Sequence, residues 1–249
     1  MPAATLYLTG DATASPFPTT SRLLSQTPKF AQVTLGPVEF DQNGPGTSDA
    51  GQWNPSSPIA DTTLAAEIDN TGASLGTTRQ GWLWDQDLTG MTLAAAAWTV
   101  RLRIAANQGT GTAARVLMRV TVVTGSGGVY TTVANLLTTQ ITGEGSHSTG
   151  QEGWRDNGSR ITVVTAPTNF ALTFAGAATS LAHTFQSGER LLIEFGFCDA
   201  DSATDRTWRL DFNTRNSLVI TPDLTDDRVM VTGGSPNLPI LGGTDILIG

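Results

Sequence analysis

The chain has little of the chemistry on which most enzymes depend. Cys198 is the only cysteine, and His147 and His183 are the only histidines in 249 residues. One cysteine excludes an intrachain disulfide and a cysteine-rich metal site. Neither histidine has a further ligand at metal-binding spacing, and Cys198 lies in an apolar run, so the sequence indicates neither a zinc site nor an activated cysteine nucleophile. We therefore expect no enzymatic activity and no resident cofactor.

Charge and long apolar runs are also scarce. Charged residues make up 14%, the net charge is −8, and Lys29 is the only lysine. Nucleic-acid binding needs clustered basic residues, so that partner is excluded. No run has the apolar length of a membrane span, and the first residues lack the order of a signal peptide. We expect no membrane partner and synthesis in the cytoplasm. The low charge has two interpretations, a surface covered by other subunits or a secreted protein from a high-GC organism.

What the sequence does contain is alternation of apolar and polar residues. In the run 98–104, Trp98, Val100, Leu102 and Ile104 share one side, with polar residues on the other. Side chains of a strand point alternately to opposite faces, so this run predicts a strand with one buried face. The pattern recurs over 115–124, 170–174, 190–198 and 206–213.

These strands define the expected fold class and its parts. Glycine-rich turns join them and no helical period intervenes, which predicts an all-β chain with antiparallel sheets packed as a β-sandwich of jelly-roll type. Residues 1–30 are expected to form an N-terminal strand and arm. Residues 31–222 form the β-sandwich with a long loop over 41–78, and residues 223–249 form an extended C-terminal arm.

Three carboxylates lie in one loop between two expected strands. Asp199, Asp201 and Asp205 offer oxygen ligands of the kind that Ca²⁺ takes. The spacing departs from an EF-hand, because the glycine and the distant glutamate are missing. The other interpretation is a solvated acidic hairpin loop whose aspartates favour turns.

Two of the six tryptophans lie in polar loops, namely Trp53 and Trp154. Each is either a lid over the sandwich or an exposed group that contacts a glycan or a protein. Trp98 and Trp208 occupy core positions of the alternating pattern. Four arginines are expected on the solvated face of a sheet, paired with Glu194 or Asp211: Arg101, Arg103, Arg115 and Arg119.

The C-terminal segment has apolar clusters but too much glycine and proline to build a core of its own. We expect it to dock either on the domain or on a neighbouring subunit. The residues expected to make these partner contacts are Val229, Val231, Ile240, Leu241, Ile246, Leu247 and Ile248.

Several blocks resemble virion structural proteins of tailed bacteriophages, especially minor tail proteins and proteins of the capsid exterior. These blocks are 6–9 (Leu-Tyr-Leu-Thr), 98–104, 185–195, 208–212 and 218–222. The resemblance implies a jelly-roll module, used as a tail protein or for capsid decoration, that forms homo-oligomers.

Together these features give an expected function. The chain is expected to be a non-enzymatic structural component of a tailed-phage virion, assembling through loops and arms. Its expected partners are other virion proteins, copies of itself and a host-surface glycan, and its location is the virion after synthesis in the host cytoplasm. The alternative is a carbohydrate- or host-receptor-binding β-sandwich module. Calcium at the aspartate loop is the one cofactor left open.

Overall fold

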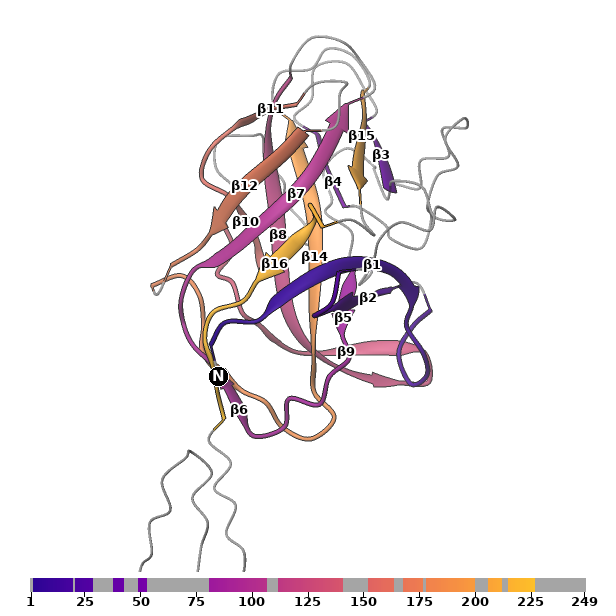
Figure 1. The fold of residues 1–249 in the computed structure, drawn as a ribbon, viewed down its shortest axis with the longest axis vertical. Coiled ribbons are helices and arrows are strands. Elements are labelled where there is room, and N and C mark those ends of the chain that lie inside the picture. Colours follow the sequence, from indigo (N-terminus) through magenta and orange to yellow (C-terminus); the bar gives the residue numbers. More distant parts are fainter. Residues whose placement is uncertain are drawn as a thin grey trace, which may run out of the picture.

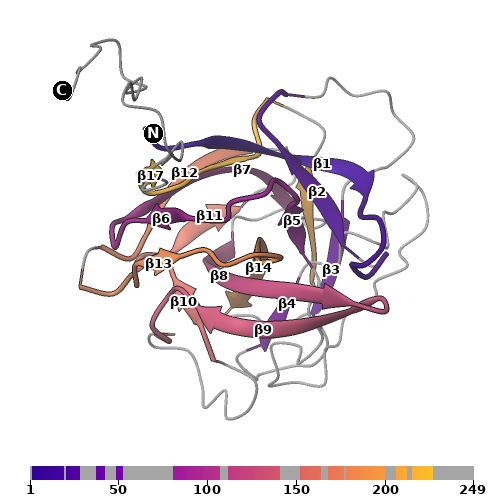
Figure 2. The ribbon, with the colours of Figure 1, turned by 90° about the horizontal axis from the view of Figure 1, so that it is seen from below.

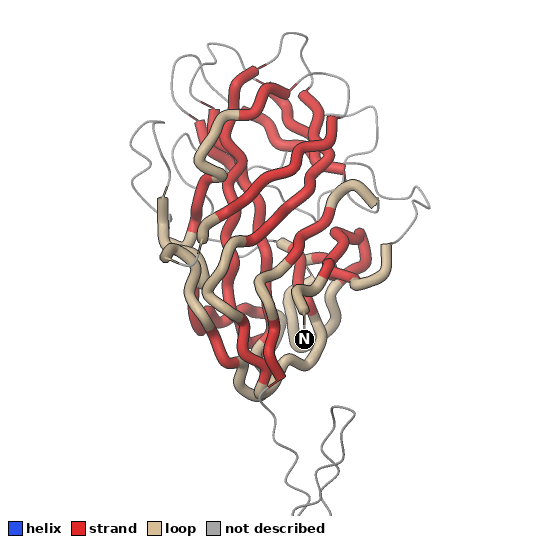
Figure 3. The backbone as a smooth tube through the Cα atoms, turned by 60° about the vertical axis from the view of Figure 1, so that its left-hand side comes forward, coloured by secondary structure: helices blue, strands red, loops and turns tan. Residues whose placement is uncertain are grey.

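The computed structural model describes residues 2–19, 21–28, 38–42, 49–52, 81–106, 112–140, 152–163, 168–176, 178–199, 206–211 and 215–226. Within these ranges every regular element is a strand, and no helix occurs (Figure 3). The expectation of an all-β chain is therefore confirmed for the described residues. No helix of the described part is long and apolar enough to cross a membrane.

The strands are short except for β8 and a few others. In chain order they are β1 (Thr5–Ala12), β2 (Arg22–Ser25), β3 (Val38–Gln42), β4 (Asp49–Gln52), β5 (Trp82–Trp84), β6 (Met91–Leu93), β7 (Trp98–Ala106), β8 (Thr112–Ser126), β9 (Val129–Asn135), β10 (Trp154–Asp156), β11 (Ile161–Val163), β12 (Thr168–Phe174), β13 (His183–Thr184), β14 (Arg190–Asp199), β15 (Arg206–Asp211), β16 (Leu218–Ile220) and β17 (Leu224–Asp226).

Most of these strands belong to one curled sheet. Its order is β10-β8-β14-β5-β2-β1-β16-β7-β15-β3, with β9 and β11 also on β8, β12 on β7 and β4 on β14. The sheet bends so that β7, β12 and β16 pass in front of β8, β10 and β14 (Figure 1). A smaller sheet of β13, β6 and β17 lies at one end of these layers, as the view from below also shows (Figure 2).

One pair departs from the expected antiparallel arrangement. β2 runs parallel to β5, with Arg22 opposite Trp82 and Leu23 opposite Leu83, so the sheet is mixed. The reason is the long chain segment between the two strands, which lets the chain return in the same direction; a short hairpin cannot.

The core lies between the two layers, where the sequence predicted it. In β7, Trp98, Val100 and Leu102 are fully buried, and Ile104 is almost so. From the opposite layer, β8 and β14 bring their own alternating sets to the same cluster, among them Met118. The expected two-sided strand pattern is therefore confirmed for β7.

The second face of β8 was expected to be solvated, and this was wrong. Arg119 is 3% exposed and its partner Glu194 is not exposed at all. The ion pair between Arg119 and Glu194 was expected, but its burial was not. The two hydrogen bonds of this pair are 2.6 Å and 2.8 Å long. The Trp154 ring lies against the guanidinium of Arg119, 4.6 Å from ring centre to Cζ, and Phe17 closely approaches Gly125 further along β8. Trp154 from the neighbouring strand β10 and Phe17 from the segment between β1 and β2 therefore cover this face.

Both ends of the described chain pair with other strands. β1 lies inside the large sheet between β2 and β16, and β17 pairs with β6. Residues 227–249, which contain all the expected partner contacts from Val229 to Ile248, lie outside the described residues. The division into an N-terminal arm, a sandwich and a C-terminal arm stays a prediction.

Candidate functional site

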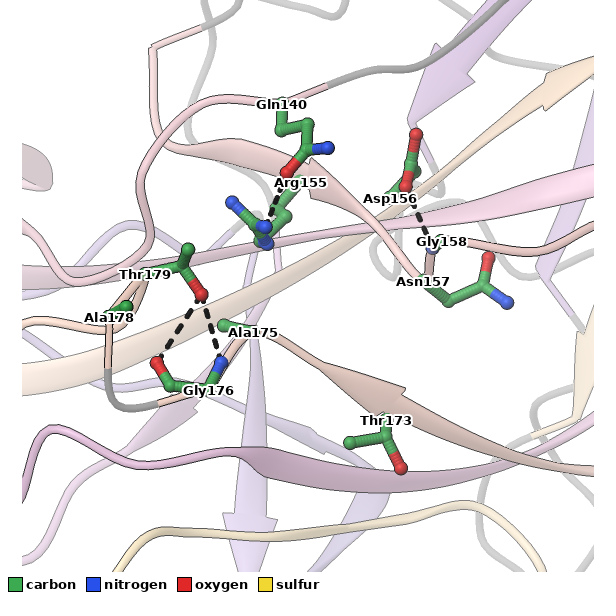
Figure 4. A pocket seen from close by; sticks show the side chains of 10 residues that line it. All are labelled: Gln140, Arg155, Asp156, Asn157, Gly158, Thr173, Ala175, Gly176, Ala178 and Thr179. Carbon is green, nitrogen blue, oxygen red and sulfur yellow. Dashed lines mark hydrogen bonds between the residues drawn. The ribbon is translucent and has the colours of Figure 1, made fainter.

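The two layers leave a pocket of about 450 Å³ at one open side, between the strands β10 and β12. One wall is the end of β10 with the turn that follows it, and the other is the end of β12 with Ala175, Gly176, Ala178 and Thr179 (Figure 4). The pocket therefore sits where each layer ends. The lining residues are Gln140, Arg155, Asp156, Asn157, Gly158, Thr173, Ala175, Gly176, Ala178 and Thr179.

Register with β8 sets the direction of the side chains on β10. Arg155 is opposite Met118, whereas Trp154 and Asp156 are opposite Arg119 and Leu117. Residues opposite each other share a face of the sheet, so Arg155 is on the face of Met118, which looks toward the other layer. Because β10 is at the rim, this inward position is half-buried and can carry a charge.

The guanidinium of Arg155 is held in place by its neighbours. Its Nη1 donates to the carbonyl oxygen of Thr138 at 3.1 Å and to the Thr138 hydroxyl at 2.9 Å, and its Nη2 donates to Oε1 of Gln140. Gln140 lies beside β10 and is held there, because its N–H donates to the carbonyl of Trp154 and its carbonyl accepts from the N–H of Asp156. Arg155 is thus aimed into the pocket by groups that are already ordered.

The wall on the β12 side is hydrogen-bonded to Thr138, the residue that also holds Arg155. The N–H of Thr138 donates to the carbonyl oxygen of Thr179 at 3.0 Å, and the Gly176 N–H donates to the Thr179 hydroxyl at 2.9 Å. Ala175 has a φ of 58°, which lies in the left-handed region that residues other than glycine rarely adopt. The closed turn therefore holds a strained residue in the lining of the pocket.

Asp156 adds little negative charge to the open space. Its side chain is almost fully buried, and its Oδ1 accepts from the Gly158 N–H at 2.7 Å. Its Oδ2 lies 4.0 Å from Nη1 of Arg115. The side chain of Asn157 already has a hydrogen-bond partner, because its Oδ1 accepts from the N–H of Val116. Arg155 is therefore the charged group that the pocket presents.

A guanidinium carries five N–H donors in one plane. The described contacts of Arg155 use its Nη atoms on Thr138 and Gln140 and leave Nε–H and part of Nη2 for another acceptor. A planar fork of this kind matches the two oxygens of a carboxylate. The pocket can therefore bind and orient an oxyanion.

A second polar cluster lies at the end that holds the smaller sheet. Nε2 of His183 is 2.8 Å from Oε2 of Glu189, which also accepts from the Gln186 N–H, and the His183 ring meets Phe185 edge-on. A histidine that is oriented by a carboxylate can act as a general base. No hydrogen bond from a serine, threonine or cysteine side chain to this histidine occurs among the described residues.

The expected site residues have different outcomes. Trp154 is fully buried and offers no surface on which a sugar ring could stack, whereas Trp53 lies outside the described residues. Asp199 ends β14, but Asp201 and Asp205 also lie outside the described residues, so calcium at this loop stays a prediction. Within the described part of the chain, no group of three histidine, cysteine, aspartate or glutamate residues could hold a metal.

Arg155, Gln140 and Thr179 were not predicted as site residues from the sequence. Trp154 had drawn attention to this strand, and residues 156–158 (Asp-Asn-Gly) carry a turn signal that marks where it ends. The alternation of β10 with Trp154 buried would have placed Arg155 on the opposite face. No local signal, however, connects Thr138 and Gln140 with Gly176 and Thr179.

Comparisons with known proteins give no family. No family model matches the chain, and no curated protein matches it. Among solved structures, an aminopeptidase from a marine-sediment Thaumarchaeota archaeon is similar with a TM-score of 0.45 and 11% identity, over 90% of this chain and 37% of that chain. An α-amino acid ester hydrolase has a TM-score of 0.44 and 12% identity, over 90% of this chain and 36% of that one.

A CocE/NonD family hydrolase from Staphylococcus aureus is similar with a TM-score of 0.42 and 7% identity, over 88% of this chain and 36% of that chain. The chain thus spans little more than a third of the length of each of these structures. At these identities and TM-scores, the similarity assigns no substrate and no catalytic residue to this chain.

These neighbours contradict the expected function. All three are hydrolases or peptidases, whereas we expected a non-enzymatic component of a virion or, alternatively, a carbohydrate- or receptor-binding module. We therefore withdraw both the expected function and the expectation that the chain lacks enzymatic activity. The resemblance to phage virion proteins and the virion location stay predictions.

Proposed function

We propose that the pocket between β10 and β12 binds a small molecule through a carboxylate or a similar oxyanion, with Arg155 as its principal contact. The observation that carries the proposal is the fixed guanidinium, which three hydrogen bonds to Thr138 and Gln140 orient while further donors remain. Charge-assisted bonds to a preorganised fork are roughly twice as strong as neutral ones, so this contact would dominate recognition.

The walls support a ligand of limited size. The volume is about 450 Å³, within the range of small-molecule sites. The other lining groups are short polar or small side chains, such as Thr173, Ala178 and Thr179. They offer hydroxyl and backbone groups together with small apolar side chains to the body of the ligand. We also infer that the two layers form a jelly roll, since β1 and β16, from opposite ends of the described chain, are paired next to β7.

The test is a titration of the full chain with acetate and, separately, with inorganic phosphate, followed by ¹H–¹⁵N NMR. We expect saturable shifts of the Arg155 Nε–H resonance and of the Gly176 amide, with acetate and phosphate compared to tell a carboxylate site from a phosphate site. Arg155→Gln should abolish the shift of the Gly176 amide, and Arg155→Lys should weaken it because a lysine lacks the planar fork.

The matched control is Arg101→Gln, since Arg101 is exposed on the outer face of β7. This variant removes the same charge at a position opposite Ala171 that does not line the pocket, and it should leave the titration unchanged. If neither probe shifts the Arg155 resonance, or if both glutamine variants lose the shifts equally, the proposed site is refuted.

A further inference from the structure

Strand β12 forms an edge of the large sheet. It pairs with β7 over seven residues, from Thr168 opposite Ile104 to Phe174 opposite Trp98, without a register shift. Among the described strands, none pairs with its other side. Figure 1 shows β12 at the outer margin of the front layer. A straight edge of this kind presents a row of backbone N–H and C=O groups that can template pairing with another strand.

Two other edges of the same sheet, those at β9 and β10, carry protective features. The β8–β9 ladder contains a register shift between Val122 and Val123, which is a bulge. The outer side of β10 is covered by Gln140, whose backbone bonds to Trp154 and Asp156. Bulges and covering segments are devices that prevent a further strand from adding to a sheet. β12, over residues 168–174, has no bulge, no proline and no charged residue.

The side chains of β12 suit a close approach. Leu172 and Phe174 are buried in the core, whereas Asn169, Ala171 and Thr173 are exposed. The exposed set is small and uncharged, with a polar residue on each side of a central alanine. A chain of net charge −8 repels its own copies, and an uncharged strand is where that repulsion is weakest.

We propose that β12 pairs with β12 of a second copy of this chain, antiparallel about a two-fold axis at Ala171. In that register Asn169 faces the partner subunit's Thr173, and Ala171 faces the partner subunit's Ala171. The amide and hydroxyl can hydrogen-bond across the strands, and no like charges meet. Over residues 169–173 the ladder would extend about 17 Å and continue the front layer of one copy into the other. Such an interface is isologous, the commonest form of homo-oligomer contact.

The first test is the oligomeric state of the full chain by sedimentation velocity over a range of concentrations. We expect a dimer, and Ala171→Lys should raise its dissociation constant about fivefold or more, because two like charges then face each other. Thr131→Lys is the matched control, since Thr131 is an exposed residue on the bulged strand β9. A parent chain that is monomeric at its highest soluble concentration, or a dimer insensitive to Ala171→Lys, overturns the proposal.

The second test addresses the register. Directly opposed residues of antiparallel strands have Cβ atoms about 4.5–5.5 Å apart, close to the separation that a disulfide needs. Ala171→Cys should therefore form a covalent dimer under mild oxidation, whereas Thr131→Cys and the parent chain with Cys198 should not. Circular dichroism checks that each variant is folded. A folded Ala171→Cys dimer that does not cross-link rejects the two-fold pairing at Ala171.

Discussion

The buried pair of Arg119 and Glu194 offers a sharp test of the covered face of β8. Glu194 has no exposed surface, and both of its oxygens accept from Arg119, at 2.6 Å and 2.8 Å. Glu194→Gln keeps the shape of the side chain but removes its charge. The guanidinium then stays buried without its counter-ion, and one of its donors faces an amide NH₂ group instead of an oxygen.

The size of the effect follows from that uncompensated charge. Breaking a buried ion pair by changing one partner costs about 3–5 kcal/mol. Arg119 keeps its contact with the face of Trp154 at 4.6 Å, and glutamine keeps one acceptor oxygen, so the low end applies. We expect a loss of about 3 kcal/mol in the free energy of unfolding, which for a domain of this size lowers Tm by about 6–12 °C.

The assay is urea unfolding followed by circular dichroism, in a double-mutant cycle. Arg119→Met alone should cost about as much as Glu194→Gln, because it strands the carboxylate. The variant with Arg119→Met and Glu194→Met should cost far less than the two single changes together, since neither charge remains. Arg101→Gln, on an exposed position, should change stability by less than about 0.5 kcal/mol. A Glu194→Gln cost below about 1 kcal/mol would show that water reaches this pair and would refute the buried face.

Three further predictions concern the packing of single residues. Gly81→Ala places a Cβ 2.3 Å from the carbonyl oxygen of Ile193, so β5 must move away from β14, and urea unfolding should show a loss of about 1–3 kcal/mol. Phe174→Ala empties a fully buried core position at the end of β12, and the same assay should show a loss of about 3–5 kcal/mol. Burial raises the pKa of the Tyr130 phenol above its usual value, so the folded state holds this proton longer than the unfolded state. Stability should therefore fall as the pH rises above about 10, and Tyr130→Phe should make the decline shallower in alkaline unfolding curves; equal slopes would contradict this.

The fold class was predictable because alternation is a local property. In β7 each residue's neighbours two positions away share its face, so Trp98, Val100 and Leu102 identify the buried side without any knowledge of the partner strand. The same reasoning failed on β8, where Arg119 interrupts a run of apolar residues. Alternation separates two faces of a strand, but it does not tell whether a further segment covers the second face. Here Trp154, on the neighbouring strand β10, and Phe17, from the segment between β1 and β2, supply that cover.

The pocket was not predictable for a related reason. Its walls come from Gln140, from residues 155–158 and from the end of β12 with Ala175, Gly176, Ala178 and Thr179, which meet only because β10 and β12 end at the same side of the two layers. The parallel pair β2–β5 was missed likewise, since pairing between remote segments leaves no periodic trace in the sequence. Arg155 alone carries a local hint, as a charged residue beside the buried Trp154.

Arg155 has two physical roles that can be told apart. A charge that points inward at the rim of a sheet discourages the addition of another strand, and this role needs only the charge. Binding an oxyanion through two parallel hydrogen bonds needs the planar fork as well. Arg155→Lys preserves the first role and impairs the second, whereas Arg155→Gln removes both. A lysine variant that binds acetate as well as the parent would therefore leave Arg155 as a protector of the sheet edge, and the oriented contacts to Thr138 and Gln140 would serve the fold alone.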